Sequence, residues 1–134
     1  MYGSSINLET AKTLAAPAMA YARAKQWTMA VAIVDVSGGL VYFEKMDDTQ
    51  NGSVDVSISK ARSAALFKRA TKVFQDGVAG GGAGLRILTL EGAIPIEGGV
   101  PIVVDGKIIG AIGVSGGTSD QDGEVAAAAL ATLS

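Results

Sequence analysis

The sequence predicts a single α+β domain over residues 1–134, with antiparallel strands covered by helices. Three observations favour this fold class. Two pairs of β-type stretches are each joined by a short turn, and strands joined in this way are antiparallel. Segments with apolar residues at helical spacing precede, separate and follow these pairs. The glycine content is about twice the usual share, which favours close approaches between backbone segments in a tightly packed chain.

The first third of the chain is expected to form a helix followed by a hairpin. Residues Asn7 to Lys25 place apolar side chains at helical spacing behind a good N-cap, and Pro17 should kink this helix. The apolar stretch Thr28 to Val36 suits a strand covered on both faces, and Leu40 to Lys45 returns beside it. Asp35 precedes the turn, where an aspartate more often accepts turn N–H groups than acts in catalysis.

A second helix is expected from Val54 to Val73, with Ser53 as its N-cap. Lys60 and Arg62 fall among the charged positions of this helix, and such a charge pattern is normally a solvated face. The glycine-rich stretch Phe74 to Leu85 lacks the Lys-Ser/Thr ending of a P-loop. We therefore interpret it as a flexible loop that acts as a lid or ligand cover.

The closing part of the chain carries the most specific local signal. The dipeptide Asp105-Gly106 favours a type I′ turn, which predicts a hairpin of Val100–Val104 and Lys107–Ser115. A Gly/Ser/Thr-rich elbow then opens an alanine-rich helix over residues 120–133.

The elbow is a candidate anion site, because it directs a helix N-terminus and unobstructed backbone N–H groups at the end of a strand. Ser119 and Asp122 are spaced as a capping box. The elbow therefore either only makes a tight turn and caps the helix, or it also binds a carboxylate or phosphate. The predicted ligand-binding residues are Lys60, Arg62, Gly98, Gly99, Ser115, Gly116, Gly117, Thr118 and Ser119.

The composition excludes several kinds of chemistry. The chain has no cysteine and no histidine, so it offers no thiolate nucleophile, no serine–histidine triad and no Cys- or His-ligated metal, and no metal site is predicted. The net charge is −2 and acidic and basic residues are interspersed, so the sequence shows no basic patch that would bind nucleic acid. No apolar run approaches the roughly 20 residues of a membrane span, and no signal-peptide pattern is present, so a cytoplasmic location without membrane contact is expected.

Three stretches of the chain resemble the GlcG/HbpS family, which also occurs as the C-terminal domain of PduO. They are VAIVDVSGGLVYFEKMD (Val31 to Asp47), SKARSAALFKRAT (Ser59 to Thr71) and IPIEGGVPIVVDGKIIGAIGVSGGTSDQD (Ile94 to Asp122). The last stretch is the most specific, because its order of glycine pairs, proline, Asp-Gly, Val-Ser-Gly and Gln-Asp is hard to meet by chance. Lys60 lies in the family's Lys-Ala helix motif.

The resemblance implies a five-stranded antiparallel sheet flanked by helices, in a profilin-like arrangement. It also implies homo-oligomers, often tetramers or octamers, and a place in diol, glycerol or glycolate metabolism or in haem binding and degradation. Haem is thus the candidate cofactor by resemblance. Haem iron is held by His, Cys, Met or Tyr, so the absence of His and Cys argues against it. The three tyrosines and the methionines remain; the methionines are expected in or near the core, and Tyr21 and Tyr42 are the ligand candidates to test.

Two functions fit these residues. The first is an oligomeric accessory protein that holds a small anionic metabolite or cofactor, with Lys60 or Arg62 supplying a positive charge. The alternative is an isomerase or hydrolase acting on a small hydroxy or carbonyl compound, in which a carboxylate is the general base and a cationic side chain stabilises an oxyanion. The catalytic candidates are Glu97, Lys60, Asp120 and Asp122. The binding function is favoured, because the two aspartates do not face each other at a helix start.

Overall fold

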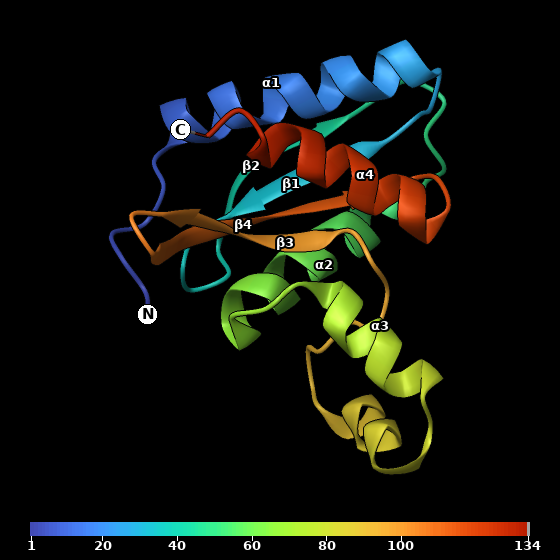
Figure 1. Cartoon of the computed structure of the whole chain (residues 1–134). Coiled ribbons are helices and arrows are strands. Elements are labelled where there is room, and N and C mark those ends of the chain that lie inside the picture. The colour runs from blue at the N-terminus through green and yellow to red at the C-terminus, as the bar shows by residue number, and fades with distance from the viewer. Residues whose placement is uncertain (134) are drawn as a thin grey trace.

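The computed structural model describes residues 1–133 and shows a sheet between two helical layers (Figure 1). The elements are α1 (Leu8–Lys25), β1 (Ala30–Val34), β2 (Leu40–Lys45), α2 (Ser53–Phe67), α3 (Thr71–Ala79), the 3-10 helix η1 (Gly82–Thr89), β3 (Gly99–Val104), β4 (Lys107–Ser115) and α4 (Ser119–Leu130). Helices α1 and α4 cover one face of the sheet and α2 covers the other. Residues 71–89, which we call the arm, lead away from the sheet. No helix in the described chain is long and apolar enough to cross a bilayer.

The predicted α+β class is confirmed, and the sheet within residues 1–133 has four strands in the order β2-β1-β4-β3. Every neighbouring pair is antiparallel. The prediction of five strands is wrong. In place of a fifth strand, the N-terminal segment makes one parallel bridge, between Tyr2 and Ile108, beyond the point where β1 ends at Val34. The profilin-like arrangement stays a prediction.

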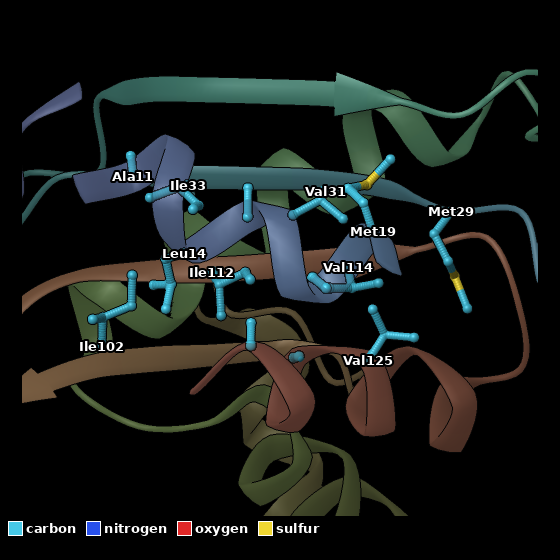
Figure 2. Packing of buried hydrophobic residues seen from close by; sticks show 14 of the residues in the cluster. Ala11, Leu14, Met19, Met29, Val31, Ile33, Ile102, Ile112, Val114 and Val125 are labelled. Atoms are coloured by element: carbon cyan, nitrogen blue, oxygen red, sulfur yellow. The ribbon is translucent and has the colours of Figure 1, made fainter. Parts of the chain in front are cut away.

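The face of the sheet beneath α1 and α4 is filled by aliphatic side chains (Figure 2). Val31 and Ile33 of β1 point to this face and meet Ile112 and Val114 of β4, because alternate residues of a strand share a side. The two helices add mostly small side chains: Ala11, Leu14, Ala15, Ala18, Met19, Ala22, Val125, Ala126 and Ala129. Each fully buried valine, leucine or isoleucine contributes about 1.5–3 kcal/mol to the stability of the fold.

The opposite face is packed differently, because the backbone of α2 touches the sheet directly. A Cβ atom on Gly113 of β4 would overlap the backbone of Ser57 and Ala61. A Cβ atom on Gly99 of β3 would overlap the carbonyl group of Lys60. The glycines in these strands therefore mark a close backbone approach, as interior strand glycines often do.

The predicted single helix from Val54 to Val73 is wrong, since α2 ends at Phe67 and Lys68 adopts a left-handed conformation with φ of 56°. The glycine-rich segment that follows is also helical rather than a flexible loop. Gly84 lies so close to Gly77 that a Cβ atom on Gly84 would overlap the Gly77 backbone. These two glycines bring α3 and η1 into contact.

The first hairpin confirms the predicted role of Asp35, and the N-cap predicted for α2 is corrected. Asp35 is a turn residue, as expected: its carboxylate accepts the N–H groups of Ser37 and Gly39 at 3.0 and 2.9 Å. A register shift between Ile33 and Val34 places Val41 on the face of α1 and Phe43 on the face of α2, although residues two apart in a regular strand share a face. Ser53 does not cap α2, because Gly52 occupies the N-cap position.

Candidate functional site

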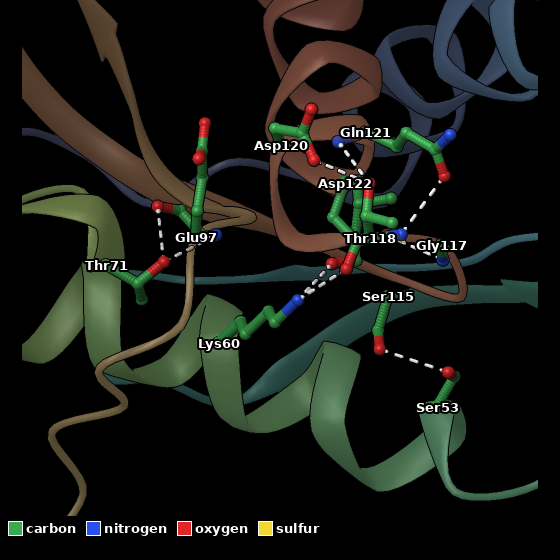
Figure 3. A network of polar contacts seen from close by, with 12 residues as sticks. Ser53, Lys60, Thr71, Glu97, Ser115, Gly117, Thr118, Asp120, Gln121 and Asp122 are labelled. Carbon is green, nitrogen blue, oxygen red and sulfur yellow. Dashed lines mark hydrogen bonds and ion pairs between the residues drawn. The ribbon is translucent and has the colours of Figure 1, made fainter. Parts of the chain in front are cut away.

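The end of β4 and the start of α4 enclose a buried ion pair between Lys60 and Asp122 (Figure 3). Lys60 Nζ lies 2.8 Å from Asp122 Oδ2 and donates a second hydrogen bond to the carbonyl oxygen of Val114 at 3.0 Å. The two side chains are 1% and 4% exposed. The prediction that Lys60 lies on a solvated face is therefore wrong.

The surroundings of Asp122 act on its charge in opposite directions. Burial raises the pKa of the Asp122 carboxyl above its usual range, while the ammonium of Lys60 and the N–H groups of Gly117 and Gly116 hold that rise back. Gly117 N–H donates to Asp122 Oδ1 at 2.9 Å. Both carboxylate oxygens therefore have partners, as a buried charge requires.

In the elbow that opens α4, backbone N–H groups donate to side chains of the first turn of α4. The predicted capping box of Ser119 and Asp122 is wrong by one residue, because Thr118 is the N-cap and Gln121 is its partner. Thr118 N–H donates to Gln121 Oε1 at 3.0 Å, and Gly117 N–H is taken by Asp122. The N–H groups of Gly117 and Thr118 are thus not unobstructed.

Asp120 and Ser115 take part in local bonds rather than facing a ligand. The Thr118 hydroxyl donates to Asp120 at 2.5 Å, and this hydrogen bond lowers the pKa of the Asp120 carboxyl. Ser115 is buried and its hydroxyl donates to Ser53 at 3.0 Å. Gly116 lies against Thr28, where a Cβ atom would overlap the Thr28 carbonyl oxygen.

The segment that leads into β3 closes the other side of the ion pair. A Cβ atom on Gly98 would lie 2.9 Å from Lys60 Nζ, so glycine leaves room for the ammonium group. Gly99 N–H donates to Thr71 Oγ1 at 2.9 Å, which ties the start of β3 to the arm. Glu97 N–H donates to Gln75 at 2.8 Å, and the Glu97 carboxylate lies over α4 at Gly123.

The structure therefore gathers the predicted site residues around one ion pair, with Arg62 as the exception. Residues two apart on a helix point in different directions, and Arg62 donates instead to the carbonyl oxygen of Gly38 at 2.8 Å. The gathered residues hold one another rather than lining a cavity. Their ligand-binding role stays a prediction.

A cavity of about 430 Å³ lies elsewhere, between α3 and η1, and we call it the arm cavity. Its lining consists of two arginines, apolar side chains and small residues: Arg69, Val73, Phe74, Gly77, Ala83, Gly84, Arg86, Ile87 and Leu90. No acidic residue belongs to this lining among the described residues. The arm cavity therefore carries an excess of positive charge within a chain of net charge −2.

Two other hollows have a different character. One of about 440 Å³ combines two cations with two carboxylates, since Arg23 and Lys45 lie beside Glu44 and Asp47. The other, of about 100 Å³, contains Arg62, which is already bonded to the turn of the first hairpin. The arm cavity alone among these three pairs a substantial volume with charge of one sign.

Apart from Met1, which is 77% exposed, the side chains able to hold haem iron are engaged in contacts within the protein or are buried. The tyrosine hydroxyls donate hydrogen bonds as follows: Tyr2 to the carbonyl of Ala65, Tyr21 to Glu124, and Tyr42 to Glu44. The bonds to glutamate raise the pKa of the Tyr21 and Tyr42 hydroxyls, which disfavours the tyrosinate that would bind iron. Met19 and Met29 are buried in the aliphatic core. These donors do not fit a haem iron.

The antiparallel sheet, the ion pair beneath α4 and the helical arm define a class of small α+β domain. The chain belongs to the HbpS-like family, described as "Haem degrading protein HbpS-like", whose model matches residues 6–131. This confirms the GlcG/HbpS resemblance. Protein GlcG of Escherichia coli K12 is 39% identical over 110 residues, which are 82% of this chain and 81% of GlcG.

Two solved structures have the same fold. Protein ORFY of Klebsiella pneumoniae is 31% identical with a TM-score of 0.88, and the match covers 100% of this chain and 96% of ORFY. A complex of PduOC with haem is 29% identical with a TM-score of 0.85, and the match covers 96% of this chain and 95% of PduOC.

Sequence reasoning missed Asp122 as the partner of Lys60 and missed both arginines of the arm cavity. Phe74 and Val78 lie four residues apart, which is a helical spacing that favours α3, but the glycines around them favoured a loop. No local pattern links Lys60 to Asp122, because 62 residues separate them.

Proposed function

We propose that this chain is an oligomeric accessory protein that binds a small anionic ligand, and that the ligand lies in the arm cavity. The observation that carries this proposal is the pairing of Arg69 and Arg86 in a lining without a carboxylate. A guanidinium group presents several N–H donors in a planar fork that matches carboxylate and phosphate oxygens. The volume of the arm cavity lies in the range of small-molecule sites, which is about 300–1,000 Å³.

Binding is better supported than catalysis by the geometry around Lys60. An enzyme of the kind considered above needs a cation that reaches an oxyanion of the substrate. The Lys60 side chain is 1% exposed and holds two acceptors of the protein itself. Asp120 is likewise bonded to Thr118, which leaves Glu97 as the candidate base.

The oligomeric part of the proposal is supported by apolar side chains that the arm leaves in solvent. Leu85 and Leu88 of η1 are 49% and 62% exposed. Large apolar side chains grouped on one exposed element favour an interface. A role in diol, glycerol or glycolate metabolism follows from the family resemblance, and the PduOC–haem complex makes haem the cofactor to test first.

Thermal unfolding with and without ligand tests the proposal, alongside the oligomeric mass. A ligand that binds the folded state alone stabilises it by about 2.7 kcal/mol when its concentration is 100 times its Kd. We expect organic anions to raise the Tm and neutral compounds of equal size to leave it unchanged. No rise with any anion, or turnover that disappears in Glu97→Gln, would contradict a binding function.

A haem titration followed by absorbance separates this proposal from a haem-binding one. We expect no saturable Soret shift at stoichiometric haem, because the hydroxyls of Tyr21 and Tyr42 are engaged and Met19 and Met29 are buried. A saturable shift that Tyr42→Phe abolishes would instead identify haem as the ligand.

A further inference from the structure

The lining of the arm cavity is chemically uneven. Apart from its two arginines, it offers aliphatic and aromatic surface and small residues, with no hydroxyl, amide or carboxylate side chain among the described residues. A polar ligand such as a polyol would lose hydrogen bonds to water there without replacing them, and each unpaired polar group is costly. The walls of the arm cavity therefore suit an apolar molecular surface.

Arg69 is held in position within this lining. Its Nε–H donates to the carbonyl oxygen of Phe67 at 2.9 Å, and its guanidinium lies 5.6 Å from the centre of the Phe74 ring. The cation–π contact and the hydrogen bond restrain the side chain, and the remaining guanidinium N–H groups make no hydrogen bond within residues 1–133. A restrained arginine loses less conformational entropy when it binds an anion.

Arg86 offers a second guanidinium whose charge is not neutralised. Throughout the described part of the chain, this side chain has neither a salt bridge nor a hydrogen bond. The acid of α3, Asp76, is paired with Lys72 at 3.1 Å. The arm cavity thus presents two positive charges beside a surface of Val73, Phe74, Ile87 and Leu90.

The glycine contact fixes how α3 and η1 meet beside the arm cavity. Gly77 and Gly84 touch backbone to backbone, and a Cβ atom on Gly77 would lie 2.7 Å from Ile87 Cδ1. This contact joins α3 to η1, and side chains of both elements line the arm cavity beside it.

We propose that the ligand of the arm cavity is an amphipathic organic anion: a carboxylate or phosphate head that Arg69 and Arg86 hold, joined to an apolar body that the aliphatic and aromatic walls cover. This inference rests on the proposed function, and it narrows the ligand to a class that excludes small polyols. Head and body are both required, because the charge supplies orientation and the apolar contact supplies most of the binding free energy.

The test compares four probes on the intact protein by isothermal titration and by amide chemical-shift changes. Octanoate and octyl phosphate have both head and body, octan-1-ol has the body alone, and acetate has the head alone. We expect at least one of the two amphipathic anions to bind about tenfold more tightly than octan-1-ol or acetate, and to shift amides of residues 71–89. The tighter of the two identifies the head group.

Variants with matched controls locate the site. Arg86→Gln should weaken binding of the better probe about tenfold, while Arg23→Gln, which removes the same charge from another hollow, should bind as the wild type does. Val73→Asn should weaken binding through the body, whereas Val103→Asn should not, because both valines are about half exposed and Val73 alone lines the arm cavity.

Three outcomes would overturn the inference. They are equal affinity for octanoate, octyl phosphate and octan-1-ol, equal weakening by Arg86→Gln and Arg23→Gln, and shifted amides confined to residues outside the arm. If a different anion raises the Tm while these probes do not bind the arm, the binding function stands and the ligand class is wrong. If no anion raises the Tm, both are wrong.

Discussion

Replacing Lys60 by methionine removes a buried ammonium group and keeps most of the volume of its side chain. The substitution leaves Asp122 without the partner 2.8 Å away and leaves the Val114 carbonyl oxygen without its side-chain donor. Gly117 N–H still donates to the other carboxylate oxygen. The variant therefore isolates the consequence of an unpaired carboxylate at a site that is 4% exposed.

The expected loss of stability is large. Breaking one side of a buried ion pair costs about 3–5 kcal/mol, because the remaining charge is uncompensated. The total free energy of unfolding of a natural domain is about 5–15 kcal/mol, so the variant should lose a substantial share of it. The double variant Lys60→Met/Asp122→Asn removes both charges and should recover much of this loss, since neutral replacement of a buried pair is often nearly neutral.

Urea unfolding at constant protein concentration measures these differences. With a slope of about 2 kcal/mol per molar urea, a loss of about 4 kcal/mol lowers the midpoint by about 2 M. Lys72→Met is the matched control, because its ion pair with Asp76 is exposed and should contribute no more than about 0.5 kcal/mol. A loss of stability below about 1 kcal/mol in Lys60→Met would refute the reasoning. So would a loss in the double variant equal to the sum of the losses in Lys60→Met and in Asp122→Asn.

The pH dependence gives a second check on the same pair. Burial raises the pKa of Asp122 in the folded protein, and the loss of Lys60 should raise it further. A carboxyl whose folded pKa exceeds its unfolded value stabilises the fold at low pH, and that stabilisation is lost as pH rises through the folded pKa. The difference between wild type and Lys60→Met should therefore shrink as pH falls from neutrality toward the ordinary aspartate value of 3.8.

Three further substitutions test other parts of the fold by the same urea assay. Asp35→Ala should cost about 1–2 kcal/mol at neutral pH through lost turn hydrogen bonds. Because the Ser37 hydroxyl and turn N–H groups lower the pKa of Asp35, this difference should vanish as pH falls through that lowered value; a pH-independent difference would contradict it. Gly113→Ala should cost about 1–3 kcal/mol by pushing α2 off the sheet, whereas Gly52→Ala, with open space around it, should stay within about 1 kcal/mol of wild type. Thr118→Ala should cost about 1 kcal/mol through the lost N-cap, and an unchanged midpoint would show that Gln121 alone suffices.

Elements defined by local rules were predicted well. Lys107–Ser115 and Leu40–Lys45 form strands with the predicted bounds, and Asn7 caps α1 by accepting the N–H of Thr10 at 2.8 Å. In each case the signal lies within a few residues of the element itself. Turn conformation and strand propensity are properties of short segments, so the sequence predicts them well, whereas the N-caps of α2 and α4 were each displaced by one residue.

Features that depend on distant partners were predicted poorly. Lys60 resembles a surface lysine because α2 also carries Asp55 and Arg62, and its burial depends on a carboxylate far away in the sequence. The glycines of the arm resemble a flexible loop, although Gly77 and Gly84 form a packing contact. A glycine provides either backbone freedom or close approach, and the surrounding structure determines which.

The bond from Gly99 N–H to Thr71 has a consequence for the order in which the molecule opens. The arm packs mainly against itself through the glycine contact, and it meets the sheet near the first residue of β3. Segments with few buried contacts to the remainder of a protein can unfold locally at a lower free energy than the whole. The exchange of the Gly99 amide with deuterated solvent will therefore report detachment of the arm while the amides of β1 remain protected.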